Sequence, residues 1–502
     1  MEEEGEPIDV TMMEAEPVNN KDNPNNHKQD RQDDEQDDTV VDEVGDFVDM
    51  TEVVEVPVDD DLPMDDDDQE TNGDVGVKGS EENDTAQDRD DTGNSQIVHD
   101  LSKFKIESHT DSVYAVASHL EQGQLFLLSG GGDDKAFLHK VAGVMSAATP
   151  ISQPLVHPHK DTVSCVAFNL PFVSDDLKKT PRLAAVGSFD GTMIVYNPDT
   201  AEQVLKLEGP SDVEWLCFHP KGGSVLLAGS GDGTIWMFHI PLNKCLQVFV
   251  GHESGVTAGC FSPDGKWALS ASADGTVRIW APKTGMNKHV FRFGSGNNDA
   301  GLTCMANNGG SDGMLVIAGG EDGMAHVCHI GTKKVVASLR HFEIPSTNTT
   351  NGDNNDEDEE EEENEYPMSV EAVGFSPFNP NWCATGGVDG VLKIWDLTKD
   401  GQCRQKCQPV EELDGITRLQ WHPSAPVVFT STNRGRITLW DARNGGLLQT
   451  LTGHTEMIND MDIQFVEGTG TAVISTVSDD KTLRVFEVDV AAALQQPVPA
   501  ST

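Results

Sequence analysis

Basic residues are scarce in this sequence, and so are long apolar stretches. Its 502 residues include 34 Lys and Arg against 85 Asp and Glu, which gives a formal net charge of −51. Nucleic-acid backbones and anionic membranes are bound by clustered Lys and Arg, so we expect a basic protein partner and no direct nucleic-acid partner. No apolar run reaches the roughly 18–20 residues of a membrane span. The first residues lack the basic and apolar regions of a signal peptide, so we expect neither a transmembrane segment nor secretion.

Closely spaced cysteines are equally scarce. The nine cysteines are dispersed along the chain, and only Cys403 and Cys407 lie near each other. A zinc site needs a second pair of ligands that this pair lacks. An odd, dispersed set is typical of reduced thiols inside the cell. We therefore expect no metal, no cofactor and a cytoplasmic location, with the nucleus as a second compartment.

Acidic charge is concentrated in two segments. Residues 1–94 hold 35 acidic and 5 basic residues with few aromatics, a composition that predicts a disordered tail. A second acidic segment, 341–367, reads as a loop insert, and 491–502 is predicted to be a disordered C-terminal tail. Within the first segment, 41–61 alternates acidic and apolar residues. It is either plain solvated tail or a short segment that pairs with a basic, partly apolar partner or with the protein's own surface.

Between these segments, residues 95–490 carry a repeated pattern. The reference copy, 251–280, has a Gly-His pair, a valine four residues after the His, a small-residue strand, an Asp-Gly turn and a Trp. Eight copies place the turn-Asp slot at positions 133, 190, 232, 274, 322, 389, 434 and 480. Their commonest spacing matches the ~40–45 residues of a four-stranded propeller blade. The pattern predicts an all-β, eight-bladed propeller that an N-terminal strand within 97–106 closes, beside a strand ending near Glu487–Val488.

This pattern resembles the WD-repeat family over about 97–490. The resemblance implies that His252, Ser270, Asp274 and Trp280 form a buried hydrogen-bonded tetrad with a structural role. Other copies depart from it, since Gly209 takes the His slot and Arg434 the Asp slot. The sequence has no P-loop, no G-x-S-x-G and no H-E-x-x-H motif, so we expect no enzyme and no catalytic residue.

The same resemblance implies a partner site on the top face of the propeller. Contacts in this family come from the residues before and after the first-strand valine and from the residue before the turn Asp. In this sequence those positions include five acids, three large apolar side chains and no Lys or Arg. An acidic, partly aromatic mouth of this kind suits an Arg- and Lys-rich peptide; the alternative is that the acidity only aids solubility. The predicted partner-binding residues are Tyr114, Phe189, Asp212, Glu214, Glu321, Glu371, Met457 and Asp479.

Three longer strings narrow the resemblance. GGGDDKAFLH, DVEWLCFHPKGGSVLLAGSGDGTIWMF and SVEAVGFSP look like the angio-associated migratory cell protein family, whose fungal counterpart is a dedicated chaperone of a large-subunit ribosomal protein. The resemblance implies capture of that protein's basic N-terminal segment by a monomer that aids 60S assembly. It also implies an alternative, a signalling scaffold in cell migration and angiogenesis on a Rho-type pathway, with peripheral membrane association. The folded body shows no Lys/Arg cluster along the sequence.

Overall fold

The computed structural model describes residues 99–143, 149–156, 159–169, 182–222, 224–293, 300–309, 314–342, 368–408 and 414–495. They belong to one compact unit, Thr92–Thr502. The predicted tail 1–94 lies outside the described residues, as does most of the predicted insert 341–367. No helix in these ranges is long and apolar enough to cross a membrane.

The described residues form eight four-stranded antiparallel sheets, which we call blades 1–8 in chain order. Blades 1–4 consist of β2 (Val113–Glu121), β3 (Gln124–Gly131), β4 (Ala136–Ala142), β5 (Ile151–Pro154); β6 (Val163–Phe168), β7 (Ala184–Ser188), β8 (Thr192–Asn197), β9 (Glu202–Glu208); β10 (Trp215–Phe218), β11 (Val225–Gly229), β12 (Ile235–His239), β13 (Lys244–Phe249); and β14 (Ala258–Phe261), β15 (Ala268–Ala271), β16 (Thr276–Trp280), β17 (Asn287–Arg292).

The remaining blades repeat the same order from inner to outer strand. Blades 5–8 consist of β18 (Leu302–Asn307), β19 (Leu315–Gly320), β20 (Met324–His329), β21 (Lys334–Arg340); β22 (Val370–Phe375), β23 (Trp382–Gly387), β24 (Leu392–Asp396), β25 (Gln402–Cys407); β26 (Ile416–Trp421), β27 (Val427–Thr432), β28 (Ile437–Asp441), β29 (Gly446–Leu451); and β30 (Ile458–Val466), β31 (Thr471–Ser478), β32 (Leu483–Asp489), β1 (Phe104–Ile106). A 3-10 turn, Leu397–Lys399, and helix α1, Val490–Gln495, complete the elements.

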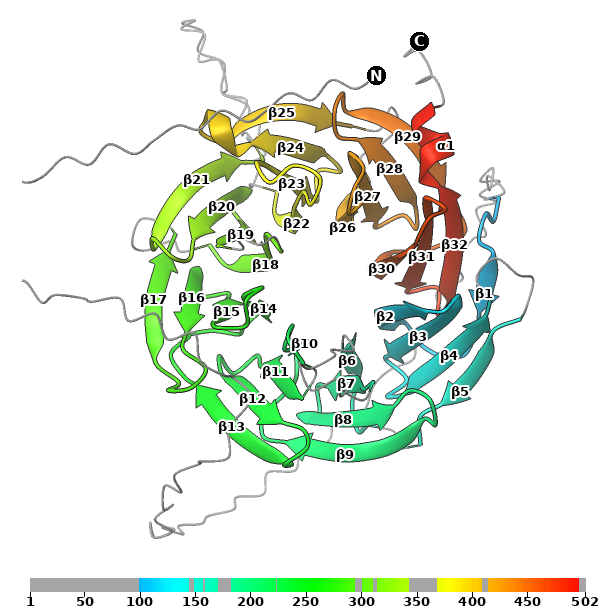
Figure 1. Ribbon diagram of the computed structural model, residues 1–502, viewed down its shortest axis with the longest axis vertical. Helices are drawn as coiled ribbons and strands as arrows, with labels where there is room; N and C mark the ends of the chain where they lie inside the picture. Colours follow the sequence, from blue (N-terminus) through cyan, green and yellow to red (C-terminus); the bar gives the residue numbers. More distant parts are fainter. Residues whose placement is uncertain are drawn as a thin grey trace, which may run out of the picture. The chain divides into compact units, whose positions relative to one another are not determined.

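The eight blades close into a ring (Figure 1). Each inner strand contacts the next, and β30 of blade 8 contacts β2 of blade 1. The N-terminal strand β1 completes blade 8, where Phe104 pairs with Val485 and Ile106 with Leu483. The structure therefore confirms the predicted eight-bladed propeller and its closing strand. The strand is shorter than 97–106, its partner β32 is the predicted strand that ends near Glu487–Val488, and α1 occupies the start of the predicted tail 491–502.

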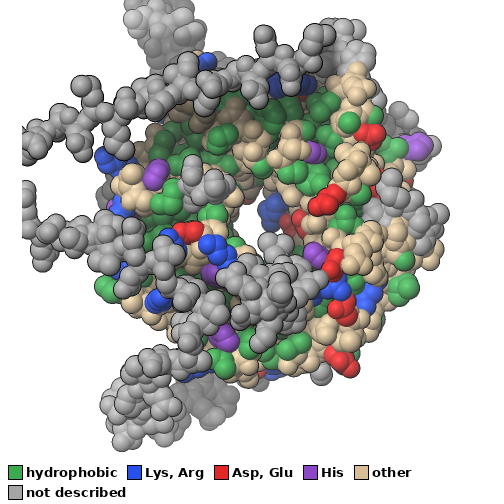
Figure 2. All heavy atoms as spheres, viewed as in Figure 1, with side chains coloured by type: hydrophobic (Ala, Val, Ile, Leu, Met, Phe, Trp, Pro, Cys, Tyr) green, Lys and Arg blue, Asp and Glu red, His purple; other side chains and the backbone are tan. Residues whose placement is uncertain are grey.

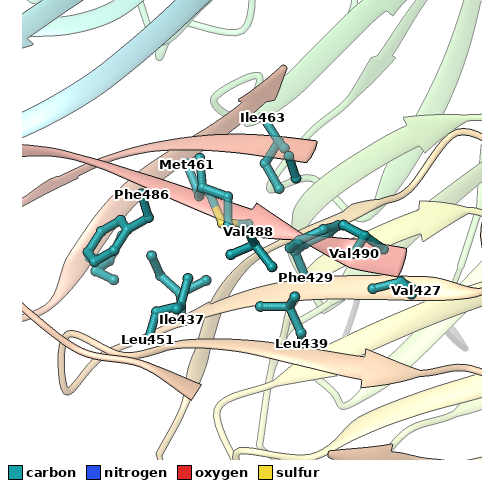
Figure 3. Packing of buried hydrophobic residues seen from close by; sticks show 13 residues of the cluster. Val427, Phe429, Ile437, Leu439, Leu451, Met461, Ile463, Phe486, Val488 and Val490 are labelled. Carbon is teal, nitrogen blue, oxygen red and sulfur yellow. The ribbon is translucent and has the colours of Figure 1, made fainter. Parts of the chain in front are cut away.

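The core lies between adjacent blades, because each middle strand is covered on both faces. This explains why β7 (AAVGS) and β31 (TAVISTVS) read as runs of small and apolar residues without polar alternation. Figure 3 shows one such layer, in which β27 and β28 of blade 7 face β30 and β32 of blade 8. Its buried members include Val427, Phe429, Ile437, Leu439, Met461, Ile463, Phe486 and Val488.

Candidate functional site

The structure brings the four predicted tetrad residues of blade 4 together. His252 Nδ1 lies 2.9 Å from Asp274 Oδ2, and its Nε2 lies 2.7 Å from Ser270 Oγ. Trp280 Nε1 donates to the same hydroxyl at 2.8 Å. Asp274 also accepts from Thr276, so every polar side chain of this buried set has a partner. A set that is saturated and buried in this way holds the turn to the blade and offers no group to a substrate.

Blade 6 contains a tetrad that the sequence analysis missed. His341 Nδ1 lies 2.7 Å from Thr385 Oγ1, its Nε2 lies 3.1 Å from Asp389 Oδ1, and Trp395 Nε1 donates to Thr385 at 2.8 Å. His341, the first residue of the predicted insert 341–367, is buried within the propeller, in the connection between β21 and β22. His252 lies four residues before its first-strand valine, whereas His341 lies far from Val370 in the sequence, so the spacing of the repeat did not reveal it.

Burial and hydrogen bonds lower the pKa values of several buried polar groups in blades 1, 2 and 8. Burial lowers the pKa of His139, which takes the Trp slot of blade 1, to about 3. Burial also lowers the pKa of His109 and His454, against the opposing effect of their aspartates. For Asp190, burial acts upward, but hydrogen bonds from Thr192 and the Lys160 amide outweigh it and lower the pKa to about 2.

We expect the free energy of unfolding to fall by roughly 2 kcal/mol between pH 7 and pH 4. The unfolded chain binds protons at the ordinary histidine pKa of about 6.5, whereas the folded chain does not, so acidification favours unfolding. Urea unfolding at a series of pH values measures this slope. The variant His139→Gln keeps a hydrogen-bonding side chain without the titration and should flatten the slope. A free energy that stays constant from pH 7 to pH 4 would contradict the prediction.

Backbone bonds hold two of the three predicted contact positions together on the top face. The amide before the turn Asp donates to the carbonyl before the first-strand valine, as in Glu321 to Gly301 at 2.9 Å and Asp479 to Met457 at 3.1 Å. Seven of the eight blades make this bond among the described residues. Each of these seven blades therefore presents both side chains at one rim, and in blade 3 the Gly231 amide donates to the Asp212 side chain instead.

The third position, after the valine, serves two purposes. In four blades its side chain donates to the backbone carbonyl of the residue in the valine slot of the next blade. This bond links neighbouring blades. These donors are Ser164, Thr257, Thr303 and Asn459. No such bond is recorded for Tyr114, Glu214 and Glu371, which leaves the larger side chains at this position for a partner.

Asp212 differs from the other predicted acids because it supports its own blade. Its Oδ1 accepts from Ser230 Oγ at 2.6 Å, from the Gly231 amide at 2.7 Å and from Ser211 Oγ at 3.2 Å. The equivalent serines Ser188, Ser272 and Ser478 donate to a backbone carbonyl instead, so in blade 3 the Asp212 carboxylate takes the place of that carbonyl. We therefore assign Asp212 mainly to the turn, where its Oδ1 accepts all three bonds.

The other four predicted acids form what we call the acidic rim: Glu214, Glu321, Glu371 and Asp479. Burial, and then the charge of Asp212, raises the pKa of Glu214. Glu371 accepts from Ser369 Oγ, and Asp479 accepts from Asn459 at 2.8 Å. No ion pair within the described ranges neutralises any of the four. The acidic rim therefore keeps carboxylate groups whose charge a cationic partner would neutralise.

Three exposed apolar side chains sit on consecutive blades, and we call them the apolar arc: Met457 of blade 8, Tyr114 of blade 1 and Phe189 of blade 2. They are 38%, 41% and 40% exposed. The sequence analysis omitted Val388, which is 45% exposed at the equivalent position of blade 6. It also omitted Lys481, which follows the turn Asp of blade 8 and donates to the Thr110 carbonyl at 3.2 Å.

Figure 2 shows that the ring has a hollow at its centre, with acidic and basic side chains around it. The inner strands supply charged residues there, including Arg418 of β26, whose Nε lies 3.2 Å from Asp460 of β30. No group of His, Cys, Asp and Glu in the described part of the chain is arranged to hold a metal ion. All nine cysteines are free thiols.

The ring, its tetrads and its loop-bordered face define a WD-repeat propeller. The family model for the WD domain, G-beta repeat, matches residues 201–239, 243–281, 366–396 and 445–487. The angio-associated migratory cell proteins of Canis lupus familiaris and Homo sapiens are 34% and 33% identical to this chain, over 77% of it and 80% of their own length. This chain therefore belongs to the angio-associated migratory cell protein family of WD-repeat proteins.

Solved structures with the same fold include two fungal proteins. Saccharomyces cerevisiae Sqt1 matches with a TM-score of 0.62 and 18% identity, over 78% of this chain and all of that chain. Chaetomium thermophilum Sqt1, solved bound to the N-terminus of the ribosomal protein L10, matches with a TM-score of 0.61 and 21% identity over the same shares. At these identities the likeness shows the propeller fold.

Proposed function

We propose that this propeller is a non-enzymatic chaperone that binds the basic N-terminal segment of a large-subunit ribosomal protein on its top face. The observation that carries the proposal is the acidic rim, whose four carboxylates lack cationic partners among the described residues. Arginine binds carboxylates through two parallel hydrogen bonds, so a short Arg-rich peptide satisfies several of these groups at once.

The apolar arc gives the same face a second mode of contact. Tyr114 and Phe189 present aromatic surface on blades 1 and 2, which lie between the blades of Asp479 and Glu214, and guanidinium groups stack on such rings. The Sqt1 complex with the L10 N-terminus shows that a propeller of this fold binds a ribosomal protein segment. We extend that partner class to this chain, together with action as a monomer in the cytoplasm and a role in 60S assembly.

The first test is binding of a synthetic peptide with the sequence of the L10 N-terminus from the same organism. We expect one peptide per propeller and an affinity that falls at least tenfold between low and high salt, because exposed charge pairs are screened. Isothermal titration at two salt concentrations measures both. Binding that is absent, or that ignores salt, would contradict a charge-based top-face site.

A pull-down from cytosol separates this function from its rival. A single basic ribosomal protein in equal amount, released by salt, supports the chaperone. Membrane or GTPase-pathway proteins without a ribosomal protein would favour a signalling scaffold in migration and angiogenesis, for which the names of the relatives are the only support.

A further inference from the structure

The outer strands of blades 4, 5 and 6 carry bases and no acid. We call these bases the basic belt: Lys288 and Arg292 on β17, Lys334 and Arg340 on β21, and Arg404 and Lys406 on β25. All six are exposed. The sequence shows no Lys/Arg cluster along the chain, because these bases come from strands that are far apart in sequence.

The three strands are linked into one surface by the turns that precede them. The charge of Lys333, in the turn before β21, is felt by His289 on β17, where it lowers the pKa after the larger effect of burial. The turn before β25 packs on β21, since a Cβ at Gly401 would meet Leu339 at 2.5 Å and Ala337 at 3.2 Å. Figure 1 shows β17, β21 and β25 following one another along the circumference.

The middle strand of this surface has an unpaired edge. β21 bonds only to β20 among the described elements, and its seven residues make it, with β9, the longest outer strand described. Val335 and Val336 are 47% and 45% exposed, and the register with β20 shifts here, which leaves Val336 without a pairing partner as at a β-bulge. A strand added at the outer edge would pair its backbone with β21 on either side of Val336 and contact the exposed valines.

We propose that the edge of β21 binds an extended acidic peptide that carries apolar residues among its Asp and Glu. The belt supplies charge on both sides of the edge, since Lys334 and Arg340 stand at the two ends of the strand. No carboxylate in the described ranges pairs with Lys288, Lys334, Arg340 or Lys406. This site is opposite in charge to the acidic rim and does not depend on the top-face function.

An acidic peptide fits this surface better than the other polyanions. A phosphate backbone would use the charges but neither the valines nor the strand edge. The circumference of a ring is convex, so a flat membrane would meet one blade at a time and leave most of the belt unused. The strand β9 provides a contrast within the same fold, because its ends carry Glu202 and Glu208.

The test is fluorescence anisotropy of a labelled peptide in which Glu and Val alternate. The peptide has about ten residues, enough for one strand and its flanks. The full-length chain should bind it, and the double variant Lys334→Glu/Arg340→Glu should weaken binding about tenfold or more, as expected for paired charges. The matched control Lys206→Glu/Lys244→Glu makes the same charge change on β9 and β13 and should stay within about twofold of the parent.

Three further measurements test the mode of binding, the class of ligand and the integrity of the fold. The same peptide N-methylated on alternate residues cannot pair along a strand edge and should bind more weakly; equal binding would overturn edge pairing. The second measurement uses a single-stranded RNA oligonucleotide. If it binds the parent more tightly than the peptide does, and the double variant no longer binds it, the proposal of a peptide ligand is overturned. Binding of the basic L10 segment should be unchanged in the double variant, since loss of both would reveal a damaged fold.

Discussion

The variant Asp462→Ala should lower the free energy of unfolding by about 3 kcal/mol, because it opens the seam where the ring closes. Asp462 lies on β30 of blade 8, and its Oδ2 accepts from the Ser118 amide at 2.6 Å and the Ser118 hydroxyl at 2.7 Å on β2 of blade 1. Its other oxygen accepts from the Ile463 amide at 2.9 Å. Each buried donor left without an acceptor costs roughly 1–3 kcal/mol.

The neighbouring bonds explain why this seam depends on side chains. Asn459 donates to the Val113 carbonyl, Asp460 accepts from the Val116 amide, and Gln464 donates to the Ser118 carbonyl. These pairs join residues about 345 positions apart, so the seam forms only when the whole ring has been assembled. Strand β1 adds three paired residues, and a hydrophobic cluster that includes Val113, Leu125, Val473 and Leu483 packs across the same seam.

Urea unfolding followed by circular dichroism measures the effect. Asp462→Asn is the matched control, because its carbonyl oxygen can still accept both bonds from Ser118 across the seam, while its NH2 group gives up only the local bond from the Ile463 amide. Burial raises the pKa of Asp462, so a neutral side chain suits the site and the Asn variant should stay within about 1 kcal/mol of the parent. An Asp462→Ala protein as stable as the parent would show that the seam does not depend on Asp462.

The fold could be predicted from the sequence because its signals are local. The turn-Asp slots recur at the spacing of a blade, and the tetrad of His252, Ser270, Asp274 and Trp280 lies within about 30 residues of chain. Even the closing strand could be anticipated, because seven complete repeats and a final one that lacks its outer strand require a partner from elsewhere. Its register was not predicted, since three residues of β1 carry too little pattern to fix it.

The site was harder to predict, because its contacts join distant residues. The role of Asp212 in its own turn depends on bonds to Ser230 and Gly231 that the sequence does not show. His341 was missed because the insert separates it from its first strand, which begins at Val370. The basic belt was not predicted, because Arg292, Arg340 and Arg404 come from three repeats that are separated by insertions. Side-chain contacts between blades therefore decide which charged residues face a partner and which hold the ring.

Binding to the top face is best tested with variants of the acidic rim that leave the hydrogen bonds within the blades intact. The triple variant Glu214→Lys/Glu321→Lys/Glu371→Lys should weaken binding of the L10 segment by about 3 kcal/mol, or more than 100-fold, because it turns three attractions into repulsions. Asp212 stays unchanged, since its reversal would break the bonds to Ser230 and Gly231 and confuse lost binding with lost structure. Titration calorimetry of the parent and the variant gives the difference.

Two matched variants separate local contact from net charge. Glu202→Lys/Glu208→Lys/Glu467→Lys makes the same change in charge at exposed positions outside the acidic rim, and should cost less than about 1 kcal/mol because those charges are screened. Replacing Glu214, Glu321 and Glu371 by Gln keeps their size and should fall between the parent and the Lys variant. If the two Lys variants weaken binding equally, only the overall charge attracts the peptide, and the acidic rim is not its site.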